Sequence, residues 1–445
     1  MSNNLKKFDS TAAYVAFRSR DGWDYPAVHV VQAGNVQETH YNNEFRMRWY
    51  DDDVAKYPRF YGDVSRDQFR DWVDNASRPC EIHKSGGSVN SEPVILYYAL
   101  NAGTTSVNSW QYLNDGTSSH YGSTDYLEMT EIDNINVGLF ENKSEGWKEV
   151  RFNFDRGCPS GFHKWFPNSR TGTKLWARYD SIPVDTVSTV STYGINVAPF
   201  QSMGSYNSSA GEYNKGIWSA DTLLAGMKAM SLPLLEETYW EHLVLTYIYC
   251  AFFGTFDTQS IYRGRTSGSQ AQSMAIDTGS TDYRYDHYGE LAFNESGMNS
   301  YRFLHIEDAI HGKAMLWAAG AAVDNKNKVY YMTYDDIKAN TFSSTTASFN
   351  RDYTDVSGFI CALTTTTSKC YMKNIDLFGM PTETSGTSDT GFYDFAFGNT
   401  TQTNGIMNVG GDTYYGYASG GFARFVNANS TSSYWDRRGR VTLNR

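Results

Sequence analysis

Alternating apolar and polar residues predict strands in the first 185 residues of the chain. The stretch 149–155 alternates strictly, which is the pattern of a strand that buries one face, here made of Val150, Phe152 and Phe154. The continuous apolar run 94–100 predicts a buried strand. Near the start, Gly34-Asn35 predicts a hairpin turn, and Ser10 predicts the start of a short helix over 11–18.

Three stretches have the spacing or the caps of helices. Ser65 and Gln68 form a capping box, and apolar residues follow at helical spacing, at Phe69, Trp72 and Val73. Ser219 is placed to cap a helix over 220–230. A longer helix is expected over 234–253 and ends at the glycine that follows it. Its apolar part is too short to span a bilayer, so it predicts a buried helix and no membrane insertion.

Together these patterns predict an α+β protein with several parts. Residues 1–79 form a helix and hairpin module, and residues 80–185 form a β-rich domain. Residues 186–216 are rich in Ser, Thr, Gly and Asn and predict a linker or long loop. Residues 217–445 begin with the two later helices and continue with short strands, including a hairpin turn within 324–331.

Composition restricts the partners and the compartment. Aromatic residues make up 16% of the 445 residues, and the formal net charge is −11. The negative charge argues against binding to nucleic acid. The first residues lack the apolar core of a signal peptide, and the five cysteines form no CxxC pair, so we expect assembly in a cytoplasm. Free buried thiols are expected, with a bridge between Cys361 and Cys370 as the alternative.

No motif predicts catalysis or metal binding. His305 and His311 lie six residues apart rather than the four that would place two ligands on one helix face. Glu128, Glu131 and Asp133 are close in sequence, but a glycosidase pair is defined by separation in space. The motifs GxSxG and HExxH and a phosphate-binding glycine loop are absent. We therefore expect no enzyme, no metal and no cofactor.

Four stretches toward the end of the chain carry a family resemblance. They are 240–268, 301–320, 408–425 and 435–444, and the third contains a Gly-Gly pair followed by aromatic residues. In this order they resemble the C-type-lectin-like fold shared by formylglycine-generating enzymes and phage tropism determinants. The closest likeness is to the variable adhesins of phages that infect gut bacteria of the Bacteroides type. The resemblance covers about 255–445 and includes the helices from 217.

The sequence departs from the family pattern at several positions. Lys313 replaces the usual Asn, Leu316-Trp317 replaces Trp-Glu, and Ala319 stands where Asp is expected. Thr413 stands where Trp often follows the Gly-Gly pair, and Arg438-Gly439 replaces Gly-Phe in the closing strand. No cysteine follows Cys370, so the oxidase chemistry of the formylglycine enzymes is not expected.

The resemblance implies that the final segment lays side chains on a rigid scaffold and binds a receptor. Tyrosines offer flat apolar faces, Asn and Ser offer adaptable hydrogen bonds, and arginines meet anionic groups. The implied receptor-binding residues are Tyr414, Tyr415, Tyr417, Arg424, Asn427, Asn429, Ser430, Ser433, Tyr434, Arg437 and Arg438. The implied structural residues are Gly410, Gly411, Phe422 and Arg440.

The implied function is that of a phage virion protein, a fibre, tail or head adhesin that binds a bacterial surface glycan or protein. A homotrimer is expected, with residues 1–79 attaching to other virion proteins and many weak sites adding by avidity. Two alternatives stay open at this point. One is a structural decoration or connector protein of the virion, and the other is an enzyme that degrades surface polysaccharide.

Overall fold

The computed structural model describes a chain built mostly of strands with two α-helices among the described residues. Neither of these helices is long and apolar enough to cross a membrane. The described residues are 15–18, 24–30, 43–51, 57–83, 93–99, 109–121, 123, 125–167, 169–179, 182–183, 195–196, 206–207, 212–213, 232, 234–264, 287–291, 300–311, 315–323, 328–331, 349–352, 370–384, 392, 394–398, 405–411, 419–429 and 437–445.

The first sheet has seven strands from the N-terminal part of the chain. Its order is β1-β2-β8-β9-β3-β4, and β10 pairs with β8. The bounds are β1 Val15–Arg18, β2 Asp24–Val30, β3 Glu44–Tyr50, β4 Arg59–Gly62, β8 Asn136–Asn142, β9 Trp147–Asn153 and β10 His163–Lys164. The helix expected over 11–18 is wrong, because Val15–Arg18 is a strand that pairs with β2. The expected hairpin around Gly34-Asn35 lies outside the described residues.

The second sheet joins residues from distant parts of the chain. Its order is β16-β29-β11-β7-β5-β6. The bounds are β5 Ser77–His83, β6 Ile95–Tyr97, β7 Tyr126–Asp133, β11 Thr173–Ala177, β16 Leu234–Glu236 and β29 Val441–Asn444. The described residues 94–99 are less buried than expected, since Val94 is 71% exposed and Leu96 is only partly buried against the cluster that contains Tyr98.

The third sheet contains nine strands from the C-terminal part. Its order is β22-β21-β20-β26-β27-β25-β23-β24, and β28 pairs with β20. The bounds are β20 Met315–Val323, β21 Lys328–Tyr331, β22 Phe349–Asp352, β23 Cys370–Ile375, β24 Pro381–Thr384, β25 Phe395–Gly398, β26 Gly405–Val409, β27 Arg424–Asn429 and β28 Arg437–Arg438. The antiparallel pairing of β20 with β21 confirms the hairpin expected within 324–331.

Several short elements complete the described structure. A three-stranded sheet contains β17 Gly289–Leu291, β18 Ser300–Phe303 and β19 Ile306–Glu307. Two small pairs join β12 Ile182–Pro183 with β13 Ile195–Asn196, and β14 Tyr206–Asn207 with β15 Glu212–Tyr213. The 3-10 turns are η1 Ser109–Gln111 and η2 Thr258–Ser260. The helix expected over 220–230 lies outside the described residues.

Helix α1, Arg66–Asn75, confirms the helix expected after Ser65. Ser65 accepts the N–H of Gln68, and the Gln68 side chain accepts the N–H of Ser65, which completes the capping box. Phe69 and Val73 are buried, and Phe69 stacks on Phe45 of β3 with ring centroids 4.5 Å apart. The spacing of the apolar residues therefore gave the correct buried face.

Helix α3, Tyr239–Phe253, is buried on nearly all sides, as the apolar sequence predicted. Its C-cap is Gly254 in the left-handed conformation, with φ 77°. The expected start at residue 234 is wrong, because 234–236 form β16 and the N-cap is Thr238. Thr238 and Glu241 form a second capping box.

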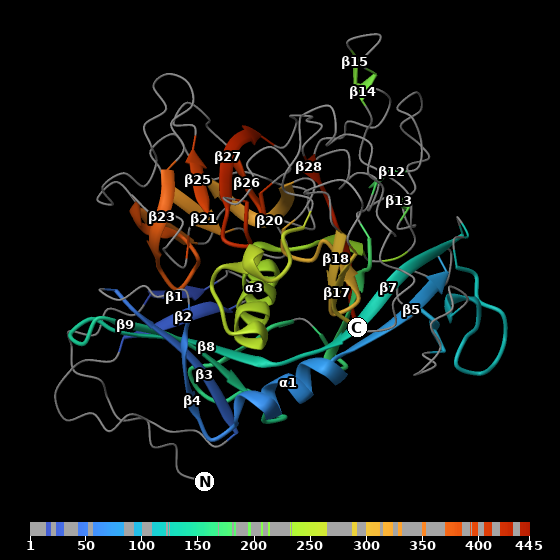
Figure 1. Ribbon diagram of the computed structural model, residues 1–445, viewed down its shortest axis with the longest axis horizontal. Helices are drawn as coiled ribbons and strands as arrows, with labels where there is room; N and C mark the ends of the chain where they lie inside the picture. The colour runs from blue at the N-terminus through green and yellow to red at the C-terminus, as the bar shows by residue number, and fades with distance from the viewer. Residues whose placement is uncertain are drawn as a thin grey trace.

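One hydrophobic core crosses the boundaries expected between the parts of the chain. Helix α3 lies between the nine-stranded sheet and the strands of the N-terminal half, as Figure 1 shows. The core extends from Phe45 of β3 through α3 to Phe422, which precedes β27. In the second sheet, β29 pairs with both β11 and β16. The described residues therefore do not separate into independent cores at 79/80 or at 216/217.

The cysteines described in full have no disulfide partner. Cys80 and Cys250 are buried free thiols, and burial raises the pKa of each above its usual value. Cys158 is free but exposed, so the expectation of burial is wrong for this residue. Cys361 lies outside the described residues, as does the side chain of Cys370.

Candidate functional site

The expected receptor-binding residues divide into described and undescribed positions. Only Arg424 has a described side chain. The backbones of Asn427 and Asn429 lie in β27, and those of Arg437 and Arg438 lie in β28. The remaining positions lie outside the described residues, namely Tyr414, Tyr415, Tyr417, Ser430, Ser433 and Tyr434. The described part of the candidate site consists of the residues that flank these positions and the side chains that contact them.

Residues 412–418, which we call the tyrosine segment, begin and end at one place. Gly411 precedes the segment with φ +59°, and a Cβ on it would lie 2.4 Å from Cα of Ser419, which follows the segment. Gly410 has φ +83°, and its Cβ would lie 2.4 Å from the carbonyl oxygen of Ile310. Only glycine fits at positions 410 and 411, because the backbones of Ile310 and Ser419 lie too close for a side chain. This is the structural role expected for both glycines.

Residues 410–411 and 419–424, which we call the glycine base, are held by two buried side chains. The carboxylate of Asp394 accepts the N–H of Gly420 at 2.9 Å and the N–H of Phe422 at 2.8 Å. The hydroxyl of Thr258 accepts the N–H of Gly421, also at 2.9 Å. Three consecutive backbone donors thus find acceptors that come from distant parts of the chain.

Burial and hydrogen bonding have opposite effects on the pKa of Asp394. Removal of its carboxyl from water raises the pKa to about 7, against the lowering effect of the N–H of Phe422. The charge of Asp257 raises this pKa further, and the N–H of Gly420 and the guanidinium of Arg424 lower it. Asp394 therefore changes its charge near neutral pH while it holds the glycine base.

Arg424 was expected to bind a receptor, and the structure contradicts this role. Its side chain is buried, with 2% of the residue exposed. The guanidinium donates to the carbonyls of Gly421 and Ala423 and, through Nε, to the hydroxyl of Tyr239 at 3.1 Å. Its carbonyl partners belong to the glycine base itself. Arg424 is thus a structural residue in this chain.

Phe422 fixes the glycine base to the core. It is fully buried and packs on the rings of Phe392, Tyr247 and Phe256. These partners come from the segment before β25, from α3 and from the turn after α3. The ring therefore has the structural place expected from its apolar character.

The strand register places the remaining expected contacts at two ends of the third sheet. Val409 pairs with Arg424 and Leu316, and Leu316 also pairs with Arg438. The backbone of β28 is thus at the end of the sheet where the glycine base lies. Asn429 pairs with Gly405, at the opposite end of β26. The expected residues therefore do not all start from one edge.

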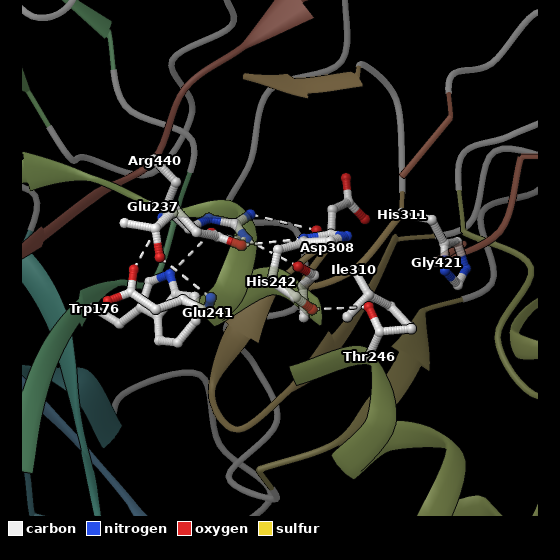
Figure 2. A network of polar contacts seen from close by, with 12 residues as sticks. Trp176, Glu237, Glu241, His242, Thr246, Asp308, Ile310, His311, Gly421 and Arg440 are labelled. Atoms are coloured by element: carbon white, nitrogen blue, oxygen red, sulfur yellow. Dashed lines mark hydrogen bonds and ion pairs between the residues drawn. The ribbon is translucent and has the colours of Figure 1, made fainter. Parts of the chain in front are cut away.

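Arg440 is the centre of a buried polar network, shown in Figure 2. Its guanidinium donates to the carbonyls of Glu307 at 2.8 Å and Ala309 at 3.1 Å. It lies 3.7 Å from the carboxylate of Glu237, and both side chains are fully buried. The same carboxylate accepts the indole N–H of Trp176 at 3.0 Å and lies 3.1 Å from Nδ1 of His242. These contacts give Arg440 the structural role expected for it.

Helix α3 connects this network with the glycine base. His242 lies one turn before Thr246, and the Thr246 hydroxyl donates to the His242 carbonyl at 2.9 Å. Thr246 and Ile310 lie directly beside Gly421, where a Cβ would approach them to 2.8 and 3.1 Å. Figure 2 shows Arg440 and Gly421 on opposite sides of these residues. The Arg440 network and the glycine base thus both contact helix α3.

The other sequence candidates do not assemble into a catalytic or metal site. Within the described part of the chain, no group of three His, Cys, Asp or Glu side chains could hold a metal. His311 is buried beside Tyr301, with its Nε2 2.8 Å from the carbonyl of Tyr262. His305 is also buried, and burial holds its pKa well below its usual value. Both histidines are core residues.

The acidic residues of β7 separate onto two faces. Glu131 and Asp133 share Arg78, at 3.2 and 2.9 Å. Glu128 lies on the other face, where it and its cross-strand partner Glu81 both accept from the hydroxyl of Tyr98, at 2.6 and 3.0 Å. Sequence reasoning missed Glu81, because only the pairing of β5 with β7 brings it to Glu128. Both carboxylates are at most 1% exposed, so no substrate reaches this pair in the structure.

Comparisons with known proteins add no family to this description. No family model matches the chain, and a search of the curated proteins finds no match. The function is therefore inferred from the residues and from the geometry above.

Proposed function

We propose that this chain is a phage virion protein that binds a bacterial surface receptor, a glycan in the first instance, through its C-terminal region. The proposal includes a C-type-lectin-like scaffold for residues 217–445, which rests on the sequence resemblance. The protein would assemble in the host cytoplasm and act as part of the virion. One observation carries the proposal: Gly411 and Ser419, the residues on either side of the tyrosine segment, meet in a buried base where Gly410 and Gly411 leave no room for a side chain.

This base supports receptor binding for a physical reason. A segment whose two ends are fixed has lost much of its conformational freedom before it binds, so less entropy is lost on binding. Its sequence, DTYYGYA, supplies tyrosines, which offer contact area at a low entropic cost. The base is held through its backbone by the side chains of Asp394, Thr258 and Arg424, so side chains of the tyrosine segment can change without loss of this support. These features are typical of a binding loop on a rigid scaffold.

The register narrows the proposed surface. The backbone of Arg437 and Arg438 lies at the same end of the sheet as the glycine base. We therefore propose that the primary contacts are the tyrosine segment and these two arginines. Asn427 and Asn429 belong to β27, whose last residue Asn429 pairs with Gly405 at the other end of β26, and they would form a secondary contact. Ser430, Ser433 and Tyr434 stay in the proposal on the sequence resemblance alone. Arg424 is not part of the proposed receptor surface, because its side chain is buried.

Binding of the purified, labelled protein to candidate host cells tests the proposal. The variant has Tyr414, Tyr415 and Tyr417 changed to Ala. A matched control has Tyr57, Tyr61 and Tyr112 changed to Ala, since these tyrosines are exposed by 70%, 41% and 51% in other regions. The thermal unfolding of all three proteins is compared first.

Loss of binding in the variant but not in the control supports the proposal. Equal binding of variant and wild type would contradict the assignment of the tyrosine segment. Failure of the wild type to bind any host whose phage carries the protein would favour a structural decoration or connector role. In that case the tyrosines should be protected from chemical modification in the assembled particle.

The proposal also includes a homotrimer attached to other virion proteins. Three receptor sites on one particle component would add weak affinities by avidity. Sedimentation equilibrium of the purified chain measures this state directly. A strictly monomeric chain at micromolar concentration would contradict the trimer but not receptor binding.

A further inference from the structure

We infer that Asp394 and Thr258 are positioning residues for receptor binding: they fix the backbone from which the tyrosine segment leaves the glycine base. This inference rests on the function proposed above. Neither residue needs to touch the receptor. Their effect would pass through the geometry of residues 419–422.

The contacts support this assignment because they are local to one short stretch. The N–H groups of Gly420, Gly421 and Phe422 all point to these two side chains. Successive N–H groups in a turn form a concave site for acceptor oxygens, and here the two carboxyl oxygens of Asp394 and the Thr258 hydroxyl occupy it. A Cβ on Gly420 would lie 2.3 Å from Oδ1 of Asp394 and 2.6 Å from the Thr258 hydroxyl. Asp394 and Thr258 together form a clamp on the backbone of residues 420–422. Because Gly420 has no side chain, both can approach this backbone to hydrogen-bonding distance.

The charged surroundings make the clamp sensitive to pH. Among the described residues, the titratable or charged groups that act on or respond to Asp394 are Asp257 in the turn after α3, Arg424 of β27 and Cys250 of α3. Burial raises the pKa of Asp394 from 3.8 to about 7. If the base opens, water returns this pKa toward its ordinary value, so opening releases a proton. Opening is therefore disfavoured at acidic pH and becomes easier as the pH rises toward about 7.

The first test measures the clamp without a receptor, by amide hydrogen exchange of a peptide that contains residues 419–424. The variant D394N keeps the shape of the side chain, but its amide NH₂ opposes one of the two backbone N–H groups. We expect exchange of this peptide to become roughly tenfold faster, as for the loss of one hydrogen bond. After correction for intrinsic rates, exchange in the wild type should also rise by about tenfold from pH 5.5 to 7.5, and exchange in D394N should not.

The second test measures binding to host cells in the same variants. D394N should bind roughly tenfold more weakly than the wild type and lose the pH dependence of binding. T258V removes the hydroxyl that accepts the N–H of Gly421 and should weaken binding to host cells. T258S keeps this hydroxyl and should bind like the wild type. The matched control is D63N, since Asp63 also accepts two backbone N–H groups, at 2.7 and 2.8 Å, but near β3 and β4. D63N should bind like the wild type.

The outcomes separate this inference from the proposed function. Unchanged binding of D394N and T258V, beside lost binding of the tyrosine variant, overturns the inference and leaves the proposed function standing. Unchanged exchange in D394N overturns the clamp itself. Absence of binding by the wild type overturns receptor binding, and the inference with it, even where exchange still shows the clamp.

Discussion

The glycine base and Arg440 anchor the same final segment by opposite means. At the glycine base, the backbone supplies the donors and a carboxylate supplies the acceptor. At Arg440, the side chain supplies the donors and backbone carbonyls accept them, while the carboxylate of Glu237 lies 3.7 Å away as an ion-pair partner. The first anchor needs glycines, which let the backbone approach these side chains, whereas the second needs the buried cation of Arg440.

The largest expected effect is at the charged anchor. Arg440→Met keeps most of the side-chain volume but leaves the carboxylate of Glu237 buried without its cation. We expect a loss of about 3–5 kcal/mol in the free energy of unfolding. Urea denaturation measures this loss. The exposed Arg156 provides the control, since Arg156→Met should change stability by less than about 0.5 kcal/mol.

The next effect is at the steric anchor. Gly410→Ala adds a Cβ at φ +83° and against the carbonyl oxygen of Ile310, so we expect a loss of about 3 kcal/mol. Gly116→Ala is the matched control, because Gly116 has φ +85° with open space around it. The control should lose only about 1–2 kcal/mol, from backbone strain alone. Equal losses in denaturation would show that contact with Ile310 contributes nothing.

The pH dependence of stability is expected to be smaller. Asp394 has a pKa of about 7 in the folded chain and about 3.8 when exposed, so its contribution to stability is greatest at low pH. That contribution is lost as the pH rises toward about 7. We expect a fall of about 2 kcal/mol between pH 5 and 8 relative to D394N, less than the full shift implies, because water penetration reduces the cost of a buried charge. A pH series of urea midpoints for both proteins measures this, and parallel series would contradict it.

The smallest effect should come from the support of Arg424. Tyr239→Phe removes the hydroxyl that accepts from Nε of Arg424. We expect a loss of about 1 kcal/mol in the free energy of unfolding, measured by urea denaturation, and no change in receptor binding. A selective loss of binding at unchanged stability would instead make Arg424 a further positioning residue of the glycine base.

Local signals in the sequence predicted the elements that depend on local contacts. The capping box at Ser65 is made and satisfied within four residues, so α1 was found with its correct start. The helix over 234–253 was found, but its start was not. Leu234–Glu236 has helical propensity and becomes a strand because β29 pairs with it across some 200 residues.

The candidate site shows the same division. The family resemblance implied that Gly410 and Gly411 are structural, and their backbone angles agree with this. The same resemblance placed Arg424 on the receptor surface, whereas its side chain is buried. Its partner Tyr239 comes from α3, and the carboxylate of Asp394 that orders its neighbours lies 30 residues before it. Only tertiary structure could identify the two side chains that hold the glycine base.

The position of β29 in its sheet has a consequence for synthesis. The strand Val441–Asn444 lies between β11 and β16, which are synthesised about 260 and about 200 residues earlier. Until residue 444 has left the ribosome, β11 and β16 lack the strand that pairs with both of them. The nascent chain therefore cannot close this sheet before β29 is made, and it would carry two open strand edges over the roughly 200 residues that separate β16 from β29.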